Sequence, residues 1–517
     1  MNWNQGYNVD LGYTYGHYRE QDPHWMDLSA VLRGTRPPSA LGLNKLRYLE
    51  LGCGQGVNLC LIAAQHPAME FVGVDFNPQH VAHAQGLADA AGLKNLRFVE
   101  ADFAELGRVW PADLGQFHYV SAHGIYTWIA PPVLQGLIAC LAQGTAPGAL
   151  VYLSYNMQPG WISTLPVQHL LRLWQVREEL PSLKAIDQGR ERLLALMEAG
   201  VGMASILPGM RARVDKFPSL DKSYLIQEYL HDNWHPKWFD QIEAELAPAK
   251  LRYVGTATAG DWYLPAMLPE KVKPLYAQYQ DATEREVMLD VLVNQGFRRD
   301  LWARGQTPLW VAEQKEMVLA QRFSLVSRPQ AKEGEAITYK FPTSLGEVEG
   351  RDDVYTPIYE AFASGPKTLA ALMQLPAPRP RQFPDTLQAV GLMMHAGHLA
   401  VSKPLTDTKP AQAINRAIAQ AVLQGAPYKN MIATAVPTVI NCSDSDLMLL
   451  ALAQGQPKPA AADLAARLTE RLLLLSRGLK KDDRALTTRE EMLPQATDMA
   501  EGFLKRTLPG WQSLGVC

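Results

Sequence analysis

The stretch Leu49-Glu50-Leu51-Gly52-Cys53-Gly54-Gln55-Gly56 decides the fold of this 517-residue chain. It follows the apolar run 46–51 and precedes the helical pattern 57–65, so it predicts a strand, a tight turn and a helix. Three glycines at alternate positions let the backbone turn sharply and let a ligand lie directly against it. The sequence therefore predicts a nucleotide-like ligand at this turn.

Two kinds of nucleotide compete for the turn. A pyrophosphate dinucleotide needs the spacing Gly-x-Gly-x-x-Gly before a helix whose N-terminus attracts anions, and here the third glycine comes one residue early. Glu50 is expected at the carboxyl end of the strand, where it repels phosphates and attracts a cationic amino-acid group. S-adenosylmethionine (SAM) carries an ammonium and a sulfonium but no phosphate. We therefore favour a methyltransferase over an NAD enzyme.

The next two predicted strands end on residues that suit the same cofactor. The run 70–75 has the pattern of a buried strand, and its terminal Asp75 is placed to accept both ribose hydroxyls. A third strand, 96–101, leads to Asp102 and Phe103, where a carboxylate can take the adenine amino group and a ring can flank the base. Acidic residues at three successive strand ends are a far more specific signal than a glycine-rich turn alone.

Five stretches resemble the class I SAM-dependent methyltransferases, and more narrowly the bacterial group that carries a methyltransferase regulatory domain. They are Tyr13-Thr14-Tyr15-Gly16-His17-Tyr18-Arg19-Glu20, Asp75-Phe76-Asn77-Pro78, His123-Gly124-Ile125-Tyr126-Thr127-Trp128, Ser154-Tyr155-Asn156-Met157-Gln158-Pro159-Gly160-Trp161 and Phe297-Arg298-Arg299-Asp300-Leu301. The best understood members of the group are rickettsial protein lysine methyltransferases, so the resemblance implies a protein lysine as methyl acceptor. It extends to about residue 310.

The acceptor is expected beside the residues that follow the fourth and fifth strands, because an open α/β sheet binds ligands at the carboxyl ends of its strands. Tyr126 and Trp128 follow the fourth strand, and Tyr155 and Asn156 the fifth, so their side chains are candidates to line a channel for an aliphatic amine. A structural role beneath a helical insertion is an equally good interpretation of Trp128. His123 can accept a proton or hydrogen-bond the cofactor's carboxylate.

These patterns give two sets of candidate site residues. The candidate catalytic residues are Tyr126, His123, Trp128, Tyr155 and Asn156. The candidate cofactor-binding residues are Glu50, Gly52, Gly54, Gly56, Asp75, Phe76, Asp102, Phe103 and His123.

The sequence does not indicate a metal site. His80 and His83 stand one helical turn apart without a carboxylate or cysteine partner, so we expect two solvent-facing histidines. The five cysteines form no Cys-x-x-Cys pair, a pattern typical of a reducing compartment. The N-terminus has no signal-peptide pattern and no segment is apolar enough to span a bilayer, so we expect a cytoplasmic protein without a membrane partner. A net charge of −3 gives no basic face for nucleic acid.

The chain is expected to fold as α/β, with a Rossmann-like, doubly wound, seven-stranded class I methyltransferase core. The sixth strand is expected near 251–254 and an antiparallel seventh near 297–302. The expected segments are an N-terminal arm over the cofactor mouth (1–45), a SAM-binding core (46–160), a helical insertion for a lid or dimerisation (161–221), a regulatory segment that completes the sheet (222–310), a linker (311–340), a winged-helix-like module (341–405) and a mostly helical C-terminal domain (406–517). The third helix of the module, 385–395, has no Lys or Arg, so we expect it to pack or to dock a protein rather than read DNA.

We predict a SAM-dependent methyltransferase that N-methylates lysine side chains of a protein by direct in-line transfer. Roughly half of the chain lies outside the core, which favours a macromolecular substrate or pairing into a homodimer over a small metabolite alone. The alternatives are a small-molecule N- or O-methyltransferase and a non-catalytic SAM-binding scaffold.

Overall fold

The computed structural model describes residues 15–200, 202–330, 337–376, 381–482 and 484–517, so Tyr13 and Thr14 of the first resembling stretch lie outside it. Its centre is a seven-stranded sheet in the order β3-β2-β1-β4-β5-β7-β6. The strands are β1 (Arg47–Leu51), β2 (Glu70–Asp75), β3 (Leu96–Glu100), β4 (Phe117–Ala122), β5 (Thr145–Asn156), β6 (Leu251–Thr256) and β7 (Phe297–Arg304). Only β7 runs antiparallel to its neighbours in this sheet. The predicted core, with its sixth and seventh strands, is therefore confirmed.

Helices cover both faces of the sheet because successive side chains of each strand point to opposite sides. On one face, Tyr48 and Phe71 belong to a hydrophobic core that continues into the region after residue 310, and on the other face Leu49 and Val72 belong to a second core. The first core includes α1 (Pro23–Leu32), α2 (Val57–Gln65) and α3 (Pro78–Ala90); the second includes α4 (Phe103–Arg108), α5 (Pro131–Gly144) and α11 (Phe239–Leu246).

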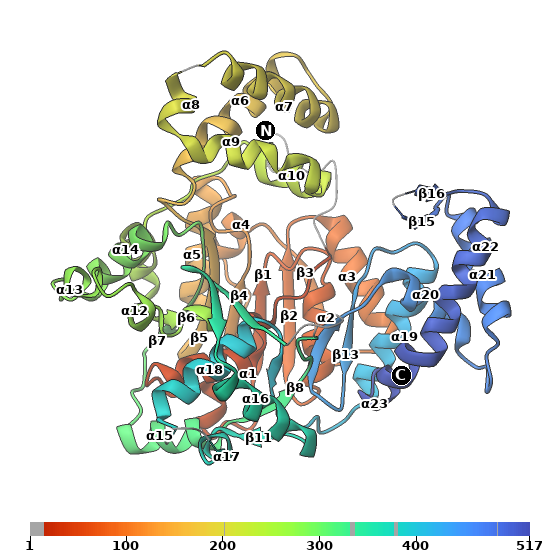
Figure 1. The fold of residues 1–517 in the computed structure, drawn as a ribbon. Coiled ribbons are helices and arrows are strands. Elements are labelled where there is room, and N and C mark those ends of the chain that lie inside the picture. Colours follow the sequence, from red (N-terminus) through yellow and green to blue (C-terminus); the bar gives the residue numbers. More distant parts are fainter. Residues whose placement is uncertain (1–14, 201, 331–336, 377–380, 483) are drawn as a thin grey trace.

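The residues after β5 form a helical lobe with a hydrophobic core of its own. It lies above the carboxyl ends of the strands, drawn in yellow in Figure 1. Its helices are α6 (Leu165–Arg177), α7 (Ser182–Glu198), α8 (Gly202–Ile206), α9 (Pro208–Asp215) and α10 (Lys222–Tyr229). The chain then returns to the sheet through α11 and β6, and the short helices α12 (Leu264–Met267) and α13 (Lys273–Tyr276) and the longer α14 (Ala282–Val293) precede β7.

Residues 311–325, which the sequence assigned to a linker, are folded and packed. They form α15 (Val311–Ala320) and β8 (Arg322–Leu325). Glu313 of α15 pairs with Arg36 of the N-terminal arm at 2.6 Å, and the Gln314 side-chain amide donates to the carbonyl of Val31 at 2.9 Å. The expectation of a linker is wrong for this part because α15 is tied to the arm through polar contacts; residues 331–336 lie outside the described chain.

The region after β8 begins with a mixed module. Strands β9 (Tyr339–Thr343) and β10 (Gly346–Gly350) form a hairpin, and β11 (Lys367–Thr368), β8 and β12 (Leu399–Val401) form a three-stranded sheet with β8 in the middle. The helices are α16 (Asp352–Ala361), α17 (Leu369–Met373) and α18 (Phe383–His395). The third helix, expected at 385–395, corresponds to α18, and the assignment of these elements as a winged-helix-like module stays a prediction.

The C-terminal region is mostly helical, as predicted. It packs beside α2 and α3 of the core, drawn in blue in Figure 1. Its elements are α19 (Lys409–Leu423), β13 (Asn430–Ala433), β14 (Thr438–Asn441), α20 (Asp444–Ala453), α21 (Ala461–Leu474), β15 (Leu479–Lys481), β16 (Arg484–Leu486), α22 (Arg489–Gly502) and α23 (Leu508–Ser513). Within the described residues, no helix combines the length and the apolar character that a membrane span requires.

Candidate active site

The turn between β1 and α2 has three glycines in the left-handed region. The φ angle is +75° at Gly52, +53° at Gly54 and +74° at Gly56, values that L side chains rarely adopt. A Cβ at Gly56 would lie 2.4 Å from the Cβ of Ala84 and 2.9 Å from the ring of Phe98, whereas a Cβ at Gly54 would meet no atom within 4 Å. Gly56 thus permits close packing of the helix, and Gly54 leaves the backbone open to a ligand.

Asp75 lies at the end of β2 and holds this turn in place. Its Oδ2 accepts a hydrogen bond from the backbone N–H of Gly54 at 2.8 Å, and its Oδ1 accepts one from the backbone N–H of Asn77 at 2.9 Å. The Nδ1 atom of His80 lies 3.2 Å from Oδ1, and Nδ1 of His83 lies 2.8 Å from the carbonyl oxygen of Gln55. The expectation of two solvent-facing histidines is therefore wrong, because both rings fold back onto the turn.

Glu50 lies at the end of β1 and is only 4% exposed. Its Oε2 has no hydrogen-bond partner among the described residues. Burial raises the pKa of Glu50 to about 8, and the neighbouring Asp75 adds to the rise. A buried carboxyl oxygen without a partner costs free energy that a cationic ligand can recover.

The remaining predicted cofactor residues line the same pocket. Asp102 caps α4, with its Oδ1 accepting from the N–H of Ala104 at 2.7 Å, and Phe103 follows it. Phe76 and His123 complete the wall. The pocket therefore brings together all nine residues predicted to bind the cofactor, although their individual contacts with it stay predictions.

His123 follows β4 and is held by polar contacts on one side and a ring on the other. Its Nδ1 lies 2.9 Å from the hydroxyl of Tyr152 and 3.0 Å from Oγ of Ser154, while the ring of Tyr18 packs against it at 3.7 Å. Burial lowers the pKa of His123 to about 3, and the positive charge of Arg299 lowers it further. The ring is neutral near pH 7 and weakly basic, so this geometry favours hydrogen bonding over proton acceptance.

Two of the candidate catalytic aromatics point into the protein. The hydroxyl of Tyr126 donates to Oε2 of Glu245 on α11 at 2.9 Å, and the hydroxyl of Tyr155 donates to Oδ2 of Asp300 on β7 at 2.5 Å. Both rings belong to the core on the α5 side of the sheet, and neither lines the pocket. Their geometry indicates packing rather than contact with a ligand.

Trp128 is the candidate acceptor-side residue that does line the pocket. Its ring lies nearly parallel to Trp234, with ring centres 5.8 Å apart, and Trp234 meets Trp161 edge to face at 5.0 Å. We call Trp128, Trp161 and Trp234 the tryptophan row. Asn156 is buried at the end of β5, where its backbone N–H donates to Oγ1 of Thr127 at 3.2 Å, and it does not line the pocket.

Comparison with known proteins identifies the family. Residues 49–148 match a methyltransferase domain, and residues 221–304 match a predicted methyltransferase regulatory domain. An uncharacterized protein of Synechocystis sp., sll1526, is 31% identical over 524 aligned residues that cover 100% of both chains. The chain belongs to the class I SAM-dependent methyltransferases that carry this regulatory domain.

The methyltransferase shares its fold with a solved structure over nearly the whole length. PKMT2 from Rickettsia typhi, solved in complex with AdoHcy, aligns with a TM-score of 0.67 at 18% identity and covers 95% of this chain and 98% of that one. An uncharacterized protein of Rickettsia prowazekii, RP789, is 24% identical over 289 residues, which are 55% of this chain and 50% of that protein. The shared architecture therefore extends beyond the cofactor-binding core.

The pocket fits SAM, the cofactor of this methyltransferase family. The unpartnered oxygen of Glu50 suits the ammonium of the methionine part, and the bare backbone at Gly54 lets a ligand approach closely. Bound SAM supplies a methyl group on a sulfonium for in-line displacement. The chain's own task is to orient the acceptor and to exclude water.

The sequence did not predict that Tyr428 of the C-terminal region packs behind the pocket wall. Tyr15 and Tyr18 of the arm line the pocket. The ring of Tyr15 in turn packs edge to face on Tyr428 at 5.6 Å, and the Tyr428 hydroxyl lies 2.7 Å from Nε2 of His83. His83 and Tyr428 are 345 residues apart, so no local pattern signals the contact.

Proposed function

We propose that this methyltransferase transfers the methyl group to the ε-amino nitrogen of a lysine in a protein substrate. The observation that carries the proposal is the tryptophan row, which begins in the wall of the cofactor pocket at Trp128 and continues through Trp234 to Trp161. Aromatic faces of this kind accept an aliphatic chain that ends in an amine. The resemblance to the rickettsial protein lysine methyltransferases and the shared fold of PKMT2 support the same acceptor.

A lysine must lose a proton before it can attack the methyl group. Burial beside the positive sulfonium lowers the pKa of the amine and promotes that loss. Glu228 of α10 is suited to accept a proton near neutrality, because burial raises its pKa to about 7 while the positive charge of Arg213 opposes the rise. The Arg213 guanidinium in turn lies 4.8 Å from the ring centre of Trp161, a member of the tryptophan row.

The helical lobe presents apolar side chains that suit a protein substrate better than a metabolite. Exposed apolar side chains on it are Ile162, Leu173, Val176, Leu183, Leu196 and Ile206. An enclosed small molecule needs no such outer surface, whereas apolar groups rimmed by polar ones are typical of protein contact sites.

The direct test is transfer of a labelled methyl group from SAM into a bacterial lysate. The label is followed into protein and into the small-molecule fraction, and labelled protein is then hydrolysed and analysed for methylated lysine. We expect methyl-lysine in protein with the wild-type enzyme and none with Asp75→Ala, whose cofactor pocket is damaged. Label confined to small molecules, or protein label without methyl-lysine, contradicts the proposal.

A matched pair of tryptophan variants tests the acceptor side. Trp234 contacts the row but does not line the cofactor pocket, so Trp234→Ala should lower kcat/KM for the protein acceptor by about tenfold while AdoHcy affinity changes by less than about twofold. Trp310 is 81% exposed at the start of α15, and Trp310→Ala should leave both quantities unchanged. Equal effects of the two substitutions on kcat/KM would contradict a role of the tryptophan row in acceptor binding.

A further inference from the structure

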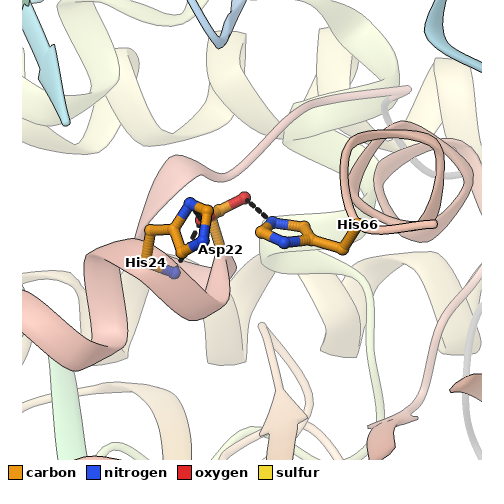
Figure 2. A group of neighbouring side chains, drawn as sticks. All are labelled: Asp22, His24 and His66. Carbon is orange, nitrogen blue, oxygen red and sulfur yellow. Dashed lines mark hydrogen bonds and ion pairs between the residues drawn. The ribbon is translucent and has the colours of Figure 1, made fainter. Parts of the chain in front are cut away.

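Three metal-ligating side chains meet where the N-terminal arm joins the core. Asp22 caps α1, His24 lies in the first turn of α1, and His66 follows the last residue of α2. Figure 2 shows both imidazole rings beside the Asp22 carboxylate, with a dashed line between Asp22 and His66. One ligand atom from each residue lies within 4.8 Å of the others. The cluster lies outside the set of residues that line the cofactor pocket.

We propose that Asp22, His24 and His66 bind one divalent transition-metal ion, with zinc as the expected ion, and that this ion fastens the arm over the cofactor pocket. Two imidazole nitrogens and one carboxylate oxygen form a donor set that suits zinc and its first-row neighbours, whereas magnesium and calcium prefer oxygen donors alone. Three protein ligands with a fourth position left to water are a common arrangement for zinc.

The cluster contains one more ligand side chain than an ion pair between Asp22 and His66 requires. His66 Nε2 already lies 2.8 Å from Oδ2 of Asp22, which is enough to join the arm to α2. His24 is a third donor, with its Nδ1 3.9 Å from Oδ1 of Asp22 and its ring centre 4.5 Å from that of His66. Among the described residues neither ring nitrogen of His24 makes a hydrogen bond. A shared cation accounts for all three side chains converging.

The backbone supports the arrangement. The N–H of His24 donates to Oδ1 of Asp22 at 2.8 Å, so the helix cap fixes the carboxylate and leaves Oδ2 turned toward His66. Outer hydrogen bonds of this kind orient the ligands of metal sites.

A cavity gives the cluster room for water and links it to the arm. All three side chains line a cavity of about 380 Å³, which is ample for a fourth, water ligand. Tyr18 lines both this cavity and the cofactor pocket, where its ring packs against His123. Because Tyr18 and Asp22 are only four residues apart, an ion held by Asp22 and His24 restrains the part of the arm that covers the cofactor.

The test uses the full-length protein, stripped of metal with a chelator, in a Cys517→Ser background that removes the exposed thiol. Zinc binding is measured by competition with a chromophoric chelator, and cobalt(II) reports the coordination through its visible spectrum. The ligand variants are Asp22→Asn, His24→Gln and His66→Gln. Asn caps helices as well as Asp does, so Asp22→Asn removes the charge while keeping α1. His169→Gln, an exposed histidine of α6, is the matched control.

We expect one zinc ion per chain, an affinity at least about tenfold weaker in each ligand variant, and no change in the control. We also expect zinc to tighten AdoHcy binding by about fivefold in the wild type and not in His24→Gln. Circular dichroism must show each variant folded. Absence of stoichiometric binding, or binding that survives all three substitutions, overturns the site. Zinc binding that leaves AdoHcy affinity unchanged overturns the fastening role.

Discussion

Glu50 should make cofactor binding release a proton. Its pKa in the ligand-free protein is about 8 rather than the ordinary 4.5, so about nine in ten molecules carry a neutral carboxyl at pH 7. The ammonium of the bound cofactor favours the ionised carboxylate, so the proton must leave when the cofactor binds. We expect binding at pH 7 to release about 0.9 proton per site.

The magnitude follows from the same pKa. Well below the pKa of Glu50, release of one proton raises affinity about tenfold per pH unit, and the slope flattens as pH approaches 8. With half of the carboxyl ionised and half of the ligand's α-amino group still protonated at pH 8, affinity should rise about 25-fold between pH 6 and 8. Above pH 8 the trend reverses, because the free cofactor's own α-amino group, with an ordinary pKa of about 8, loses its proton. Affinity should therefore peak near pH 8.

Folding stability must change in the opposite direction. A carboxyl whose folded pKa lies above its unfolded pKa stays protonated while the unfolded chain ionises, so stability falls as pH rises from 4.5 to 8. The difference in pKa corresponds to at most about 5 kcal/mol by pH 8 and about 3 kcal/mol at pH 7. Glu50→Gln should remove this dependence and stabilise the ligand-free protein at neutral pH.

Calorimetry with AdoHcy from pH 6 to 9, in pairs of buffers with different ionisation enthalpies, counts the released protons directly. Glu50→Gln should release none below pH 8 and should bind with nearly constant affinity from pH 6 to 7.5. Glu105→Gln, at an exposed glutamate of α4, should behave as the wild type. Proton release that persists in Glu50→Gln, or a flat wild-type affinity between pH 6 and 8, would refute the reasoning.

Four further substitutions distinguish residues that stabilise the fold from residues that take part in the reaction. Gly56→Ala should lower the free energy of unfolding by about 3 kcal/mol or more, because the new Cβ adds a steric clash to the strain of a positive φ angle. Gly54→Ala should lower it by about 1 kcal/mol, because only the backbone strain applies there. Equal losses of stability in chemical denaturation would contradict this. Tyr155→Phe should lower the free energy of unfolding by about 1–2 kcal/mol and leave kcat within about twofold, whereas a large loss of kcat would restore its catalytic role. His123→Asn should leave the pH profile of kcat/KM unchanged between pH 6 and 8, since the pKa of this histidine is about 3; loss of an ionisation in that range would show that it titrates there.

The residues of the cofactor pocket could be predicted from the sequence because the strands that carry them are parallel. The carboxyl ends of β1, β2, β3 and β4 lie at one edge of the sheet, so residues that follow those strands in the sequence must meet there. Local pattern identifies the strands, and the right-handed βαβ connections restrict the possible strand orders to a few. Glu50, Asp75 and Asp102 therefore reach one pocket without any long-range information.

The orientations of the candidate acceptor-side tyrosines could not be predicted, because they depend on partners distant in the sequence. Tyr155 and Asn156 were expected to follow the fifth strand, but β5 includes both residues, so Tyr155 keeps the alternation of a buried strand and its hydroxyl bonds to Asp300. Tyr126 lies in a loop, and α11, more than 100 residues later, supplies its partner Glu245. Nothing near Tyr126 in the sequence reveals which way its ring turns.

The C-terminal region supports the cofactor pocket from behind, because Tyr15 of the pocket wall packs against Tyr428. Tyr15 lines the pocket on one side and packs against His83 and Tyr428 on the other, while Tyr428 lies within hydrogen-bonding distance of His83. The same His83 lies 2.8 Å from the carbonyl oxygen of Gln55 in the glycine turn. A displacement of Tyr428 would therefore change both the packing of Tyr15 in the pocket wall and the contact of His83 with the glycine turn.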